Sequence, residues 1–428
     1  MSEETNLPKG WKISKLGEVC FTTSGGTPNR SQSKYYEGDI PWVKSGELDK
    51  GLILDTEEKI TQEAVQKSSA KIFPKGTLLI ALYGATIGKL AFLGIDAATN
   101  QAVCGIYKNE KVDSKYLYYY LFFKKPSLVK QGIGGAQPNI NQGILKNLDL
   151  PLPSLQEQQL IVSKIEELLS DLENGKQQLQ IAQQQLKVYR QSLLKWAFEG
   201  KLNTKAKKNE LPNEWKIIKL KDLTLEKVGL RRGPFGSAIK KEFFVKDGYK
   251  VYEQGNAINN DPYRGRYFID ENKYQELINF KVVPEDLIVS CSGVTLGRIC
   301  EIPKDAKPGI INQALLRIRL KKDLILNKYF VFHFRGAFFQ KKIFDQSQGT
   351  AMPNLVGIKD FKEIDMLIPP IEEQIIILSE LESKLTVCDK IEETITQSLQ
   401  QAETLRQSIL KKAFEGKLVN VNESKSVA

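Results

Sequence analysis

The sequence predicts an α/β protein made of two tandem mixed α/β domains, each followed by a long helix, with the two helices packed against each other as a coiled coil. Three observations support this fold class: an internal duplication, short apolar runs separated by turn residues, and two stretches with a seven-residue apolar repeat. The chain has 428 residues, which is enough for about two to three domains.

The internal duplication runs through nearly the whole chain. The segment "LPKGW" at 7–11 returns as "LPNEW" at 211–215, and "QSLLKWAFEGKL" at 191–202 returns as "QSILKKAFEGKL" at 407–418. Between them lie further matching pairs in the same order, such as "LLIALYGATIGKLAF" and "DLIVSCSGVTLGRIC". An ordered series of matches indicates one ancestral unit that was duplicated.

The first part of each repeat, at 1–153 and 211–369, has the pattern of a mixed α/β domain. Short apolar runs such as "TLLIALYG" and "DLIVSCSG" are separated by Gly, Pro, Asn and Asp. Runs of this length between turn residues are typical of strands. We therefore expect one globular domain in each of these two ranges.

A long helix is expected at 154–202 and another at 370–418, with a linker at 203–210 and a flexible tail at 419–428. Apolar residues recur there every seven positions, which indicates a coiled coil. Roughly 45 residues per helix would give a rod about 65 Å long, which would hold the domains a fixed distance apart if the helices ran antiparallel. The repeat positions are Ile165, Leu172, Leu179, Leu186 and Leu193 in the first helix and Leu381, Cys388, Ile395, Ala402 and Ile409 in the second, with Trp196 and Leu405 at companion positions.

The composition favours a nucleic-acid partner. The net charge is +11 and the sequence pI is about 9.1. Such an excess of positive charge favours polyanions, of which nucleic acid is the commonest. No apolar run approaches the roughly 20 residues of a membrane helix, and the N-terminus has no targeting pattern. The five cysteines include no CxxC pair, which fits a reduced cytosolic protein.

Motifs for catalysis or metal binding are missing from the sequence. The single histidine, His333, excludes a histidine-rich zinc site, and its counterpart in the first repeat is Tyr120. The segment "GATIGK" at 84–89 has three residues between its glycines where a phosphate loop needs four. No GxSxG or S-adenosylmethionine-binding motif occurs. We therefore expect a binding subunit without a catalytic residue, metal or cofactor of its own.

Polar loops carry the candidate nucleic-acid contacts. Arg and Lys suit guanine edges and phosphates, whereas Asn and Gln suit adenine. The loops differ between the repeats more than the helices do, which indicates two different targets read from a shared scaffold. The candidates are Arg30, Lys34, Tyr35, Lys44, Ser45, Thr86 and Lys89 in the first repeat and Arg231, Arg232, Lys240, Gln254, Asn256, Arg264, Arg266, Thr295 and Arg298 in the second.

These segments together resemble the specificity subunit of a type I restriction–modification enzyme. The resemblance rests on the two "LPxxW" starts, the loops "VKSGEL" and "YEQGNAI", the helix entries "PLPSLQEQ" and "IPPIEEQ", and the two "AFEGKL" endings. It spans the chain from about Leu7 to Leu418. It implies two target-recognition domains whose helices form an antiparallel coiled coil with pseudo-two-fold symmetry.

The resemblance also implies a function. Each recognition domain would read one half of a bipartite, asymmetric target in double-stranded DNA, and the coiled coil would fix the spacer. Two methyltransferase subunits, carrying S-adenosylmethionine, would dock on the helices, and restriction subunits that use ATP and Mg would then join. Recognition loops would fall within 23–48 and 229–268, and nearby segments add Tyr83, Gln137, Asn139, Ser292, Thr350 and Asn354.

Other functions remain open. The chain could be a DNA- or RNA-binding scaffold unrelated to restriction, or a nuclease with an unrecognised site. A pure oligomerisation adaptor fits the net charge of +11 less well. Cleavage or methylation of DNA by the purified chain alone would favour an enzyme over a binding subunit.

Overall fold

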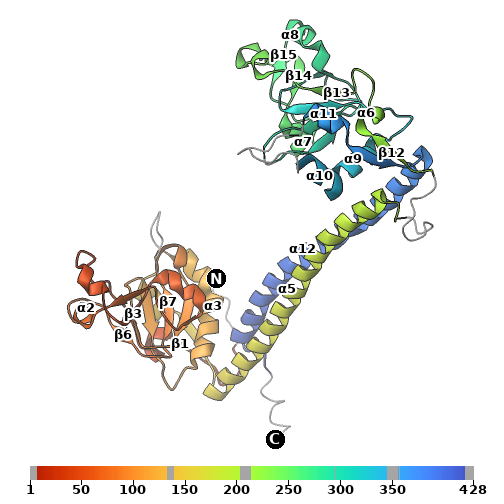
Figure 1. Ribbon diagram of the computed structural model, residues 1–428. Coiled ribbons are helices and arrows are strands. Elements are labelled where there is room, and N and C mark those ends of the chain that lie inside the picture. The colour runs from red at the N-terminus through yellow and green to blue at the C-terminus, as the bar shows by residue number, and fades with distance from the viewer. Residues whose placement is uncertain are drawn as a thin grey trace. The chain divides into compact units, whose positions relative to one another are not determined.

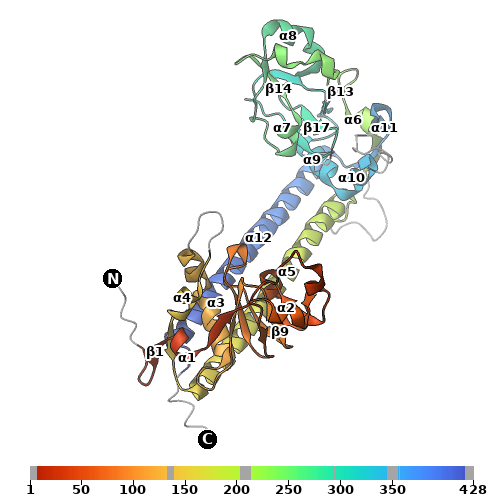
Figure 2. The same ribbon diagram turned by 90° about the vertical axis from the view of Figure 1, so that its left-hand side faces the viewer.

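The computed structural model describes residues 7–132, 139–202, 214–293, 295–344, 355 and 357–419. The chain divides into two compact units: unit 1 is Met1–Leu179 with Thr396–Ala428, and unit 2 is Gln180–Ile395. Each unit holds one globular domain and part of each long helix (Figures 1 and 2). The long helices are α5 (Leu155–Phe198) and α12 (Ile371–Phe414), each of 44 residues. The domain boundaries predicted from the sequence treat each long helix as a separate segment. In the structure, the first part of each helix belongs to one compact unit and the rest to the other.

The globular domain of unit 1 is built from three sheets with the strand orders β1-β11, β2-β10-β7-β8-β4 and β5-β3-β9-β6. The sheets are mixed, because β3–β9 and β4–β8 are parallel pairs and the other pairs are antiparallel. The strands are β1 Lys12–Lys15, β2 Thr22–Ser24, β3 Ile40–Val43, β4 Leu52–Ile53, β5 Glu58–Ile60, β6 Ile72–Phe73, β7 Leu78–Ala81, β8 Leu90–Leu93, β9 Ala97–Thr99, β10 Val103–Ile106 and β11 Asp149–Leu152. The helices are α1 Leu16–Val19, η1 Ser33–Tyr36, η2 Ser45–Lys50, α2 Gln62–Gln66, η3 Gly84–Thr86, α3 Ser114–Gln131 and α4 Gln142–Lys146.

Unit 2 has the strand orders β12-β21, β13-β20-β17-β18 and β15-β14-β19-β16, which repeat those of unit 1 except that no described strand corresponds to β4. The parallel pair β14–β19 corresponds to β3–β9. The strands are β12 Lys216–Lys219, β13 Leu230–Arg232, β14 Tyr249–Tyr252, β15 Phe268–Ile269, β16 Lys281–Val282, β17 Leu287–Ser290, β18 Ile299–Glu301, β19 Gly309–Ile311, β20 Leu315–Ile318 and β21 Asp365–Ile368. The helices are α6 Leu220–Leu223, η4 Gly236–Ala238, η5 Lys241–Phe243, α7 Gln254–Ile258, α8 Glu271–Glu276, η6 Ile278–Phe280, α9 Asn327–Arg335, α10 Ala337–Phe344 and α11 Ile358–Lys362. The duplicated mixed α/β fold that the sequence predicts is therefore confirmed.

The apolar runs of the sequence form the central strands. β7 and β17 contain "LLIA" and "LIVS", and all four residues of each strand are buried. Continuous burial explains why these segments are apolar throughout and do not alternate, because both faces of the strand are covered.

Each globular domain is joined to its long helix by buried polar contacts. In unit 1 the indole Nε1 of Trp11 donates to Glu157 Oε1 at 2.8 Å. Gln158, one residue further along α5, is completely buried. Its side-chain carbonyl accepts from the backbone N–H of Asp113 at 2.8 Å, and its amide donates to the carbonyl of Lys111 at 3.1 Å. These bonds fix where α5 leaves the domain.

Unit 2 makes the same contacts with its own residues. Trp215 Nε1 donates to Glu373 Oε2 at 2.8 Å, and Gln374 is completely buried. Gln374 accepts from the N–H of Leu326 and donates to the carbonyl of Leu324, each at 2.9 Å. The paired "LPxxW" and "EQ" segments of the sequence therefore mark one junction between each domain and its helix.

We expect Gln158→Ala or Gln374→Ala to lower the free energy of unfolding of its unit by about 1–3 kcal/mol per buried group left without a partner. The physical reason is that each glutamine satisfies backbone groups that have no access to water. Urea unfolding measures the loss. Gln156→Ala, at an exposed position of the same helix, is the matched control, and equal losses from Gln156→Ala and Gln158→Ala would contradict this role.

The two long helices run antiparallel within each unit. Unit 1 contains the first part of α5 and the last part of α12, and unit 2 contains the reverse. In unit 2, Arg190 donates to Asp389 at 2.7 Å and to Glu392 at 3.0 Å. In unit 1, Arg406 donates to Glu173 at 3.3 Å. Figures 1 and 2 both show α5 and α12 side by side.

Most of the predicted repeat positions face the partner helix or the adjoining core. The companion positions do not: Trp196 is 42% exposed and Leu405 is 51% exposed, so the prediction that they lie in the helix seam is wrong. Ala197 and Ala413, which follow the repeat positions Leu193 and Ile409 by four residues, are fully buried, and Arg406, four residues after Ala402, is half-buried. The buried companion positions therefore follow the repeat positions by four residues and not by three. The buried repeat residues are Ile165, Leu186, Leu193, Leu381, Cys388, Ile395, Ala402 and Ile409, and Leu172 and Leu179 are half-buried.

Candidate nucleic-acid interface

A cluster of basic and aromatic side chains lies beside β3 in unit 1. The guanidinium carbon of Arg30 lies 4.3 Å from the ring centroid of Tyr36 and 4.9 Å from that of Trp42. Arg30 donates to Glu58 Oε2 at 2.6 Å, and Lys44 Nζ lies 3.1 Å from Glu58 Oε1. The hydrogen bond from Arg30 lowers the pKa of the Glu58 carboxyl, so this carboxylate is charged and holds both cations. Stacking and ion pairing together restrict the Arg30 side chain before any partner arrives.

The remaining predicted residues of this loop surround the cluster. Lys34 is exposed and lies in η1, and Tyr35 beside it is half-buried. The carbonyl of Tyr35 accepts from the N–H of Thr61 at 3.0 Å, which fixes η1 against the start of α2. Ser45 is the half-buried first residue of η2. Lys34 therefore offers an exposed cation on η1, the helix that also carries Tyr36, on which Arg30 stacks.

The turn between β7 and β8 presents a second group of predicted residues in unit 1. Tyr83 is 43% exposed, and its backbone pairs with that of Asn139 in an isolated bridge. The Thr86 hydroxyl donates to the carbonyl of Tyr83 at 2.7 Å, and Lys89 forms an ion pair with Asp49. The structure therefore brings Tyr83 and Asn139 together. The Thr86 hydroxyl is engaged in closing the turn.

In unit 2, helix α7 places two predicted amides in different surroundings. The amide of Gln254 donates to the carbonyl of Ser292 at 2.9 Å and to its hydroxyl at 3.0 Å, which ties α7 to the turn after β17. Asn256 is only 2% exposed; its amide donates to the carbonyl of Asp261 at 2.9 Å, and its Oδ1 accepts from the N–H of Glu253 at 2.8 Å. The prediction that Asn256 reads a base is therefore wrong, because its hydrogen-bonding groups are used inside the loop that it organises.

The loop after α7 carries two exposed arginines. Arg264 is exposed, and its backbone N–H donates to Asp261 Oδ1 at 3.1 Å. Arg266 Nε donates to Glu253 Oε2 at 3.0 Å, and its guanidinium carbon lies 4.7 Å from the ring centroid of Tyr267. This arrangement of an arginine over an aromatic ring and beside a glutamate matches that of Arg30 in unit 1.

Two more predicted arginines lie on β13, at the edge of the second sheet of unit 2. Arg231 and Arg232 are half-buried, and the Nε of Arg231 has no hydrogen-bond partner among the described residues. Lys240 is exposed and lies 3.5 Å from a carboxylate oxygen of Glu242. These three side chains extend the basic character of the loops around α7.

The turn between β17 and β18 corresponds to the turn between β7 and β8. Thr295 is half-buried and Arg298 is exposed. The remaining predicted contacts, Gln137, Thr350 and Asn354, lie outside the residues that the structure describes.

Three residues that organise these loops were not predicted. Glu58 and Glu253 each pair with a predicted arginine, and their signal in the sequence is only a carboxylate near a basic loop. Lys250 is 2% exposed; its Nζ donates to the carbonyl of Pro262 and lies 4.5 Å from the ring centroid of Tyr252. Burial lowers the pKa of Lys250. The apolar pattern of "YKVY" gives no sign that its lysine points inward.

Neither a metal site nor a membrane segment is found in the described part of the chain. Within it, no group of three or more His, Cys, Asp or Glu side chains could hold a metal ion. No helix there is both long and apolar enough to cross a bilayer. All five cysteines are buried free thiols. What the two units offer is a pair of basic, aromatic-supported loop surfaces on a duplicated scaffold.

Comparison with known proteins agrees with this description. The type I restriction modification DNA specificity domain matches residues 8–183 and again 212–401. The MjaIX specificity subunit of Methanocaldococcus jannaschii is 26% identical over 386 residues, covering 85% of this chain and 84% of its own length. The StySPI specificity subunit of Salmonella potsdam is 26% identical over 430 residues, covering 96% and 90%.

Solved structures show the same fold. One, from work titled "Structural basis underlying complex assembly and conformational transition of the type I R-M system", has a TM-score of 0.70 at 19% identity and covers 96% of this chain and 99% of its own. The HsdS subunit from Thermoanaerobacter tengcongensis has a TM-score of 0.62 at 18% identity and covers 96% and 98%.

The fold and the loops define a protein of two homologous binding domains, each continued by a long helix. The chain belongs to the family of type I restriction–modification DNA specificity domains, and it contains two copies of that domain.

Proposed function

We propose that this chain is the DNA-recognition subunit of a type I restriction–modification complex and that each unit reads one half of a bipartite, asymmetric target in double-stranded DNA. The observation that carries the proposal is the repeated topology with different exposed side chains. Unit 1 offers Arg30 and Lys34, whereas unit 2 offers Arg264 and Arg266. Two similar domains with different loops suit two different half-sites.

The chemistry of the complex is assigned to partner subunits. Two methyltransferase subunits dock on the helical regions and bring S-adenosylmethionine, and restriction subunits add ATP- and Mg-dependent cleavage. Support comes from the near-identical "AFEGKL" ends of α5 and α12, because a repeated surface suits two copies of one partner. This chain then supplies binding and positioning.

Footprinting tests the proposal against its alternatives. With the methyltransferase subunit present, the chain is expected to protect two separated sets of bases and to direct methylation. The chain alone is expected neither to cleave nor to methylate DNA. Cleavage by the purified chain would overturn the proposal in favour of a nuclease, and protection without dependent methylation would favour a scaffold unrelated to restriction.

The exposed cation Lys34 is expected to contact phosphate. Lys34→Ala should weaken binding to target and non-target DNA alike and should reduce the slope of log K against log[salt] by about 1, because one fewer counterion is released. Fluorescence anisotropy at several salt concentrations measures the slope. Lys187→Ala, an exposed position on α5, is the control that should leave it unchanged. An unaltered slope in Lys34→Ala would exclude the phosphate contact.

A further inference from the structure

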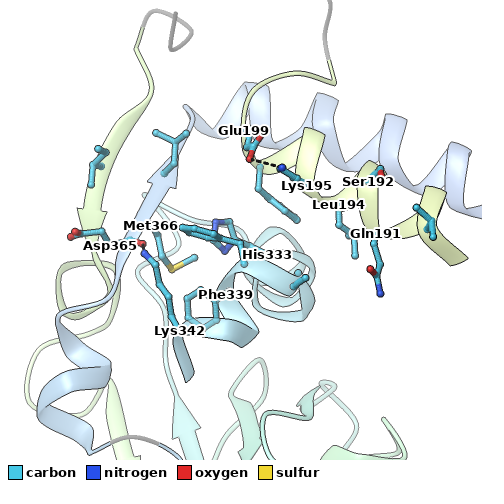
Figure 3. A pocket seen from close by; sticks show the side chains of 17 residues that line it. Gln191, Ser192, Leu194, Lys195, Glu199, His333, Phe339, Lys342, Asp365 and Met366 are labelled. Carbon is cyan, nitrogen blue, oxygen red and sulfur yellow. Dashed lines mark hydrogen bonds and ion pairs between the residues drawn. The ribbon is translucent and has the colours of Figure 1, made fainter. Parts of the chain in front are cut away.

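Unit 2 contains an apolar cavity that the proposed DNA contacts do not use. It has a volume of about 480 Å³ and lies between the end of α5, helices α9 and α10, and strands β12 and β21. Figure 3 shows His333, Met366 and Phe339 on one side and Leu194 on the α5 side. We refer to it as the α9–α10 cavity. Its size lies within the range of pockets that bind drug-sized molecules, so it has ample room for an aromatic ring.

His333 lines the α9–α10 cavity with a buried imidazole ring. The side chain lines the cavity, is 5% exposed, and has an Nδ1 atom with no hydrogen-bond partner among the described residues. Burial lowers the pKa of His333 to about 4, so its ring is neutral near pH 7. A buried ring nitrogen without a partner costs free energy, and the neutral ring adds a largely apolar wall to the cavity.

In unit 1 the space at the end of the long helix is filled by aromatic rings, and the cavity beside Tyr120 is lined by residues of α3, α4 and β11 and by none of α12. Phe414, the counterpart of Phe198, packs on Tyr116, Tyr120 and Phe123, with ring centroids at 5.3, 5.1 and 5.7 Å. Tyr120, the counterpart of His333, also donates its hydroxyl to the carbonyl of Asp149. Phe414 is consequently buried, with 4% exposure.

Two substitutions between the repeats open the cavity in unit 2. His333 is shorter than Tyr120, and the carbonyl of Asp365 accepts instead from Lys342 at 3.2 Å. Gly336 stands where unit 1 has Phe123. A Cβ built on Gly336 would lie 3.9 Å from Phe198 Cδ2. A side chain there would therefore approach Phe198, just as Phe123 stacks on Phe414, the counterpart of Phe198 in unit 1.

The rim of the cavity differs between the units in the same direction. Val188, Ile217 and Phe338 line the α9–α10 cavity and are 65%, 67% and 67% exposed. The counterparts of Val188 and Phe338 in unit 1 are the polar Thr404 and Lys125, whereas the counterpart of Ile217 is Ile13, which is also apolar and exposed. A free small molecule in the cavity would leave these apolar side chains exposed to water. A protein partner would bury them.

We propose that the α9–α10 cavity receives an aromatic side chain, tyrosine or tryptophan, from a protein partner, and that unit 1 has no matching site. The ring occupies part of the apolar volume, beside the imidazole of His333. An aromatic anchor in a pocket with an apolar rim is the arrangement that dominates binding energy at protein interfaces. The partner, which rests on the proposed function, is the methyltransferase subunit, because the cavity borders the end of α5 where that subunit is proposed to dock; its two copies then dock through different contacts.

The cavity is tested first without any partner. Because the chain has one histidine, labelling histidine with ¹⁵N gives a single imidazole to follow by NMR. Titration with indole is expected to shift that signal to saturation in the full chain and in Gly336→Ala, and to leave it unchanged in Gly336→Phe, which copies Phe123. Leu194→Phe fills the cavity from α5 and serves if Gly336→Phe fails to fold. No shift in the unaltered chain, or an equal shift in a folded filled variant, would overturn the site.

The partner is tested by native mass spectrometry with the methyltransferase subunit. The unaltered chain is expected to bind two copies, and Gly336→Phe to bind one of them at least tenfold more weakly. Equal binding of both copies by Gly336→Phe would overturn docking at the cavity and leave the proposed function intact. Failure of the unaltered chain to bind the methyltransferase would instead count against the proposed function, and the indole titration would still decide whether the cavity binds an aromatic ring.

Discussion

Replacing residues 1–153 with the corresponding domain of another family member is expected to change one half of the DNA target and to leave the other half and the spacer unchanged. The reason is that the predicted contacts of unit 1, among them Arg30 and Lys34, all precede α5, while the helix pairing that would set the spacer follows Leu155. The effect is large because each mismatched base pair costs about 1–3 kcal/mol, so the original target should lose nearly all binding. Sequencing of methylated adenines after incubation with the methyltransferase subunit measures both halves.

The junction between domain and helix decides whether this exchange keeps a folded protein. The incoming domain must supply a tryptophan at the position of Trp11 for Glu157 and a backbone N–H equivalent to that of Asp113 for Gln158. A control chain that exchanges 1–153 but removes the tryptophan is expected to fold less stably and to retain the new half-site. If both halves of the target change in the well-folded exchange, recognition is not divided between the units.

Asp286→Ala is expected to destabilise unit 2 by about 3–5 kcal/mol. Asp286 is 1% exposed and accepts two hydrogen bonds from Arg319, at 2.6 and 3.1 Å. Arg317, also buried, donates to the carbonyl of Lys281 close by. Removing the carboxylate leaves these guanidinium groups without a counter-charge, and a loss of this size is a large share of the stability of a typical domain.

The first repeat supplies the matched control for this substitution. Thr77 occupies the position of Asp286, is 1% exposed, and donates its hydroxyl to the carbonyl of Pro74 at 2.7 Å. Thr77→Ala should cost only about 1 kcal/mol, because a neutral hydrogen bond is lost and no charge is stranded. Hydrogen exchange of the strand amides measures the stability of each unit separately. Asp286→Ala should reduce the protection of the β17 amides about a hundredfold or more and leave the protection of the β7 amides unchanged. Similar losses in β7 and β17 would show that the two units do not unfold separately.

The fold could be predicted from the sequence because it depends on patterns that repeat. The apolar runs of β7 and β17, the turn residues between strands, and the long regions without helix breakers each appear twice. The seam of the long helices was predicted less well, since a seven-residue spacing is compatible with companion positions at three or four residues. The buried residue is Ala197, whose small side chain gives a weak apolar signal in the sequence. Its neighbour Trp196 gives a strong apolar signal but is exposed.

The candidate interface was harder to predict because residue type does not reveal the direction of a side chain. Asn256 has the chemistry of a base reader, yet its amide closes a loop, and that use depends on the positions of Asp261 and Glu253 in space. Likewise, Gly336 stands where the first repeat has Phe123, but this difference indicates a cavity only once the packing around Phe198 and Phe414 is known.

The most direct test of the central claim is the sequence motif methylated when this chain is combined with its methyltransferase subunit on random DNA. Sequencing of methylated adenines is expected to give two short specified blocks, different from each other, separated by a spacer of fixed length and no sequence preference. A single continuous block, or methylation that does not depend on this chain, would contradict recognition of one half-site by each unit.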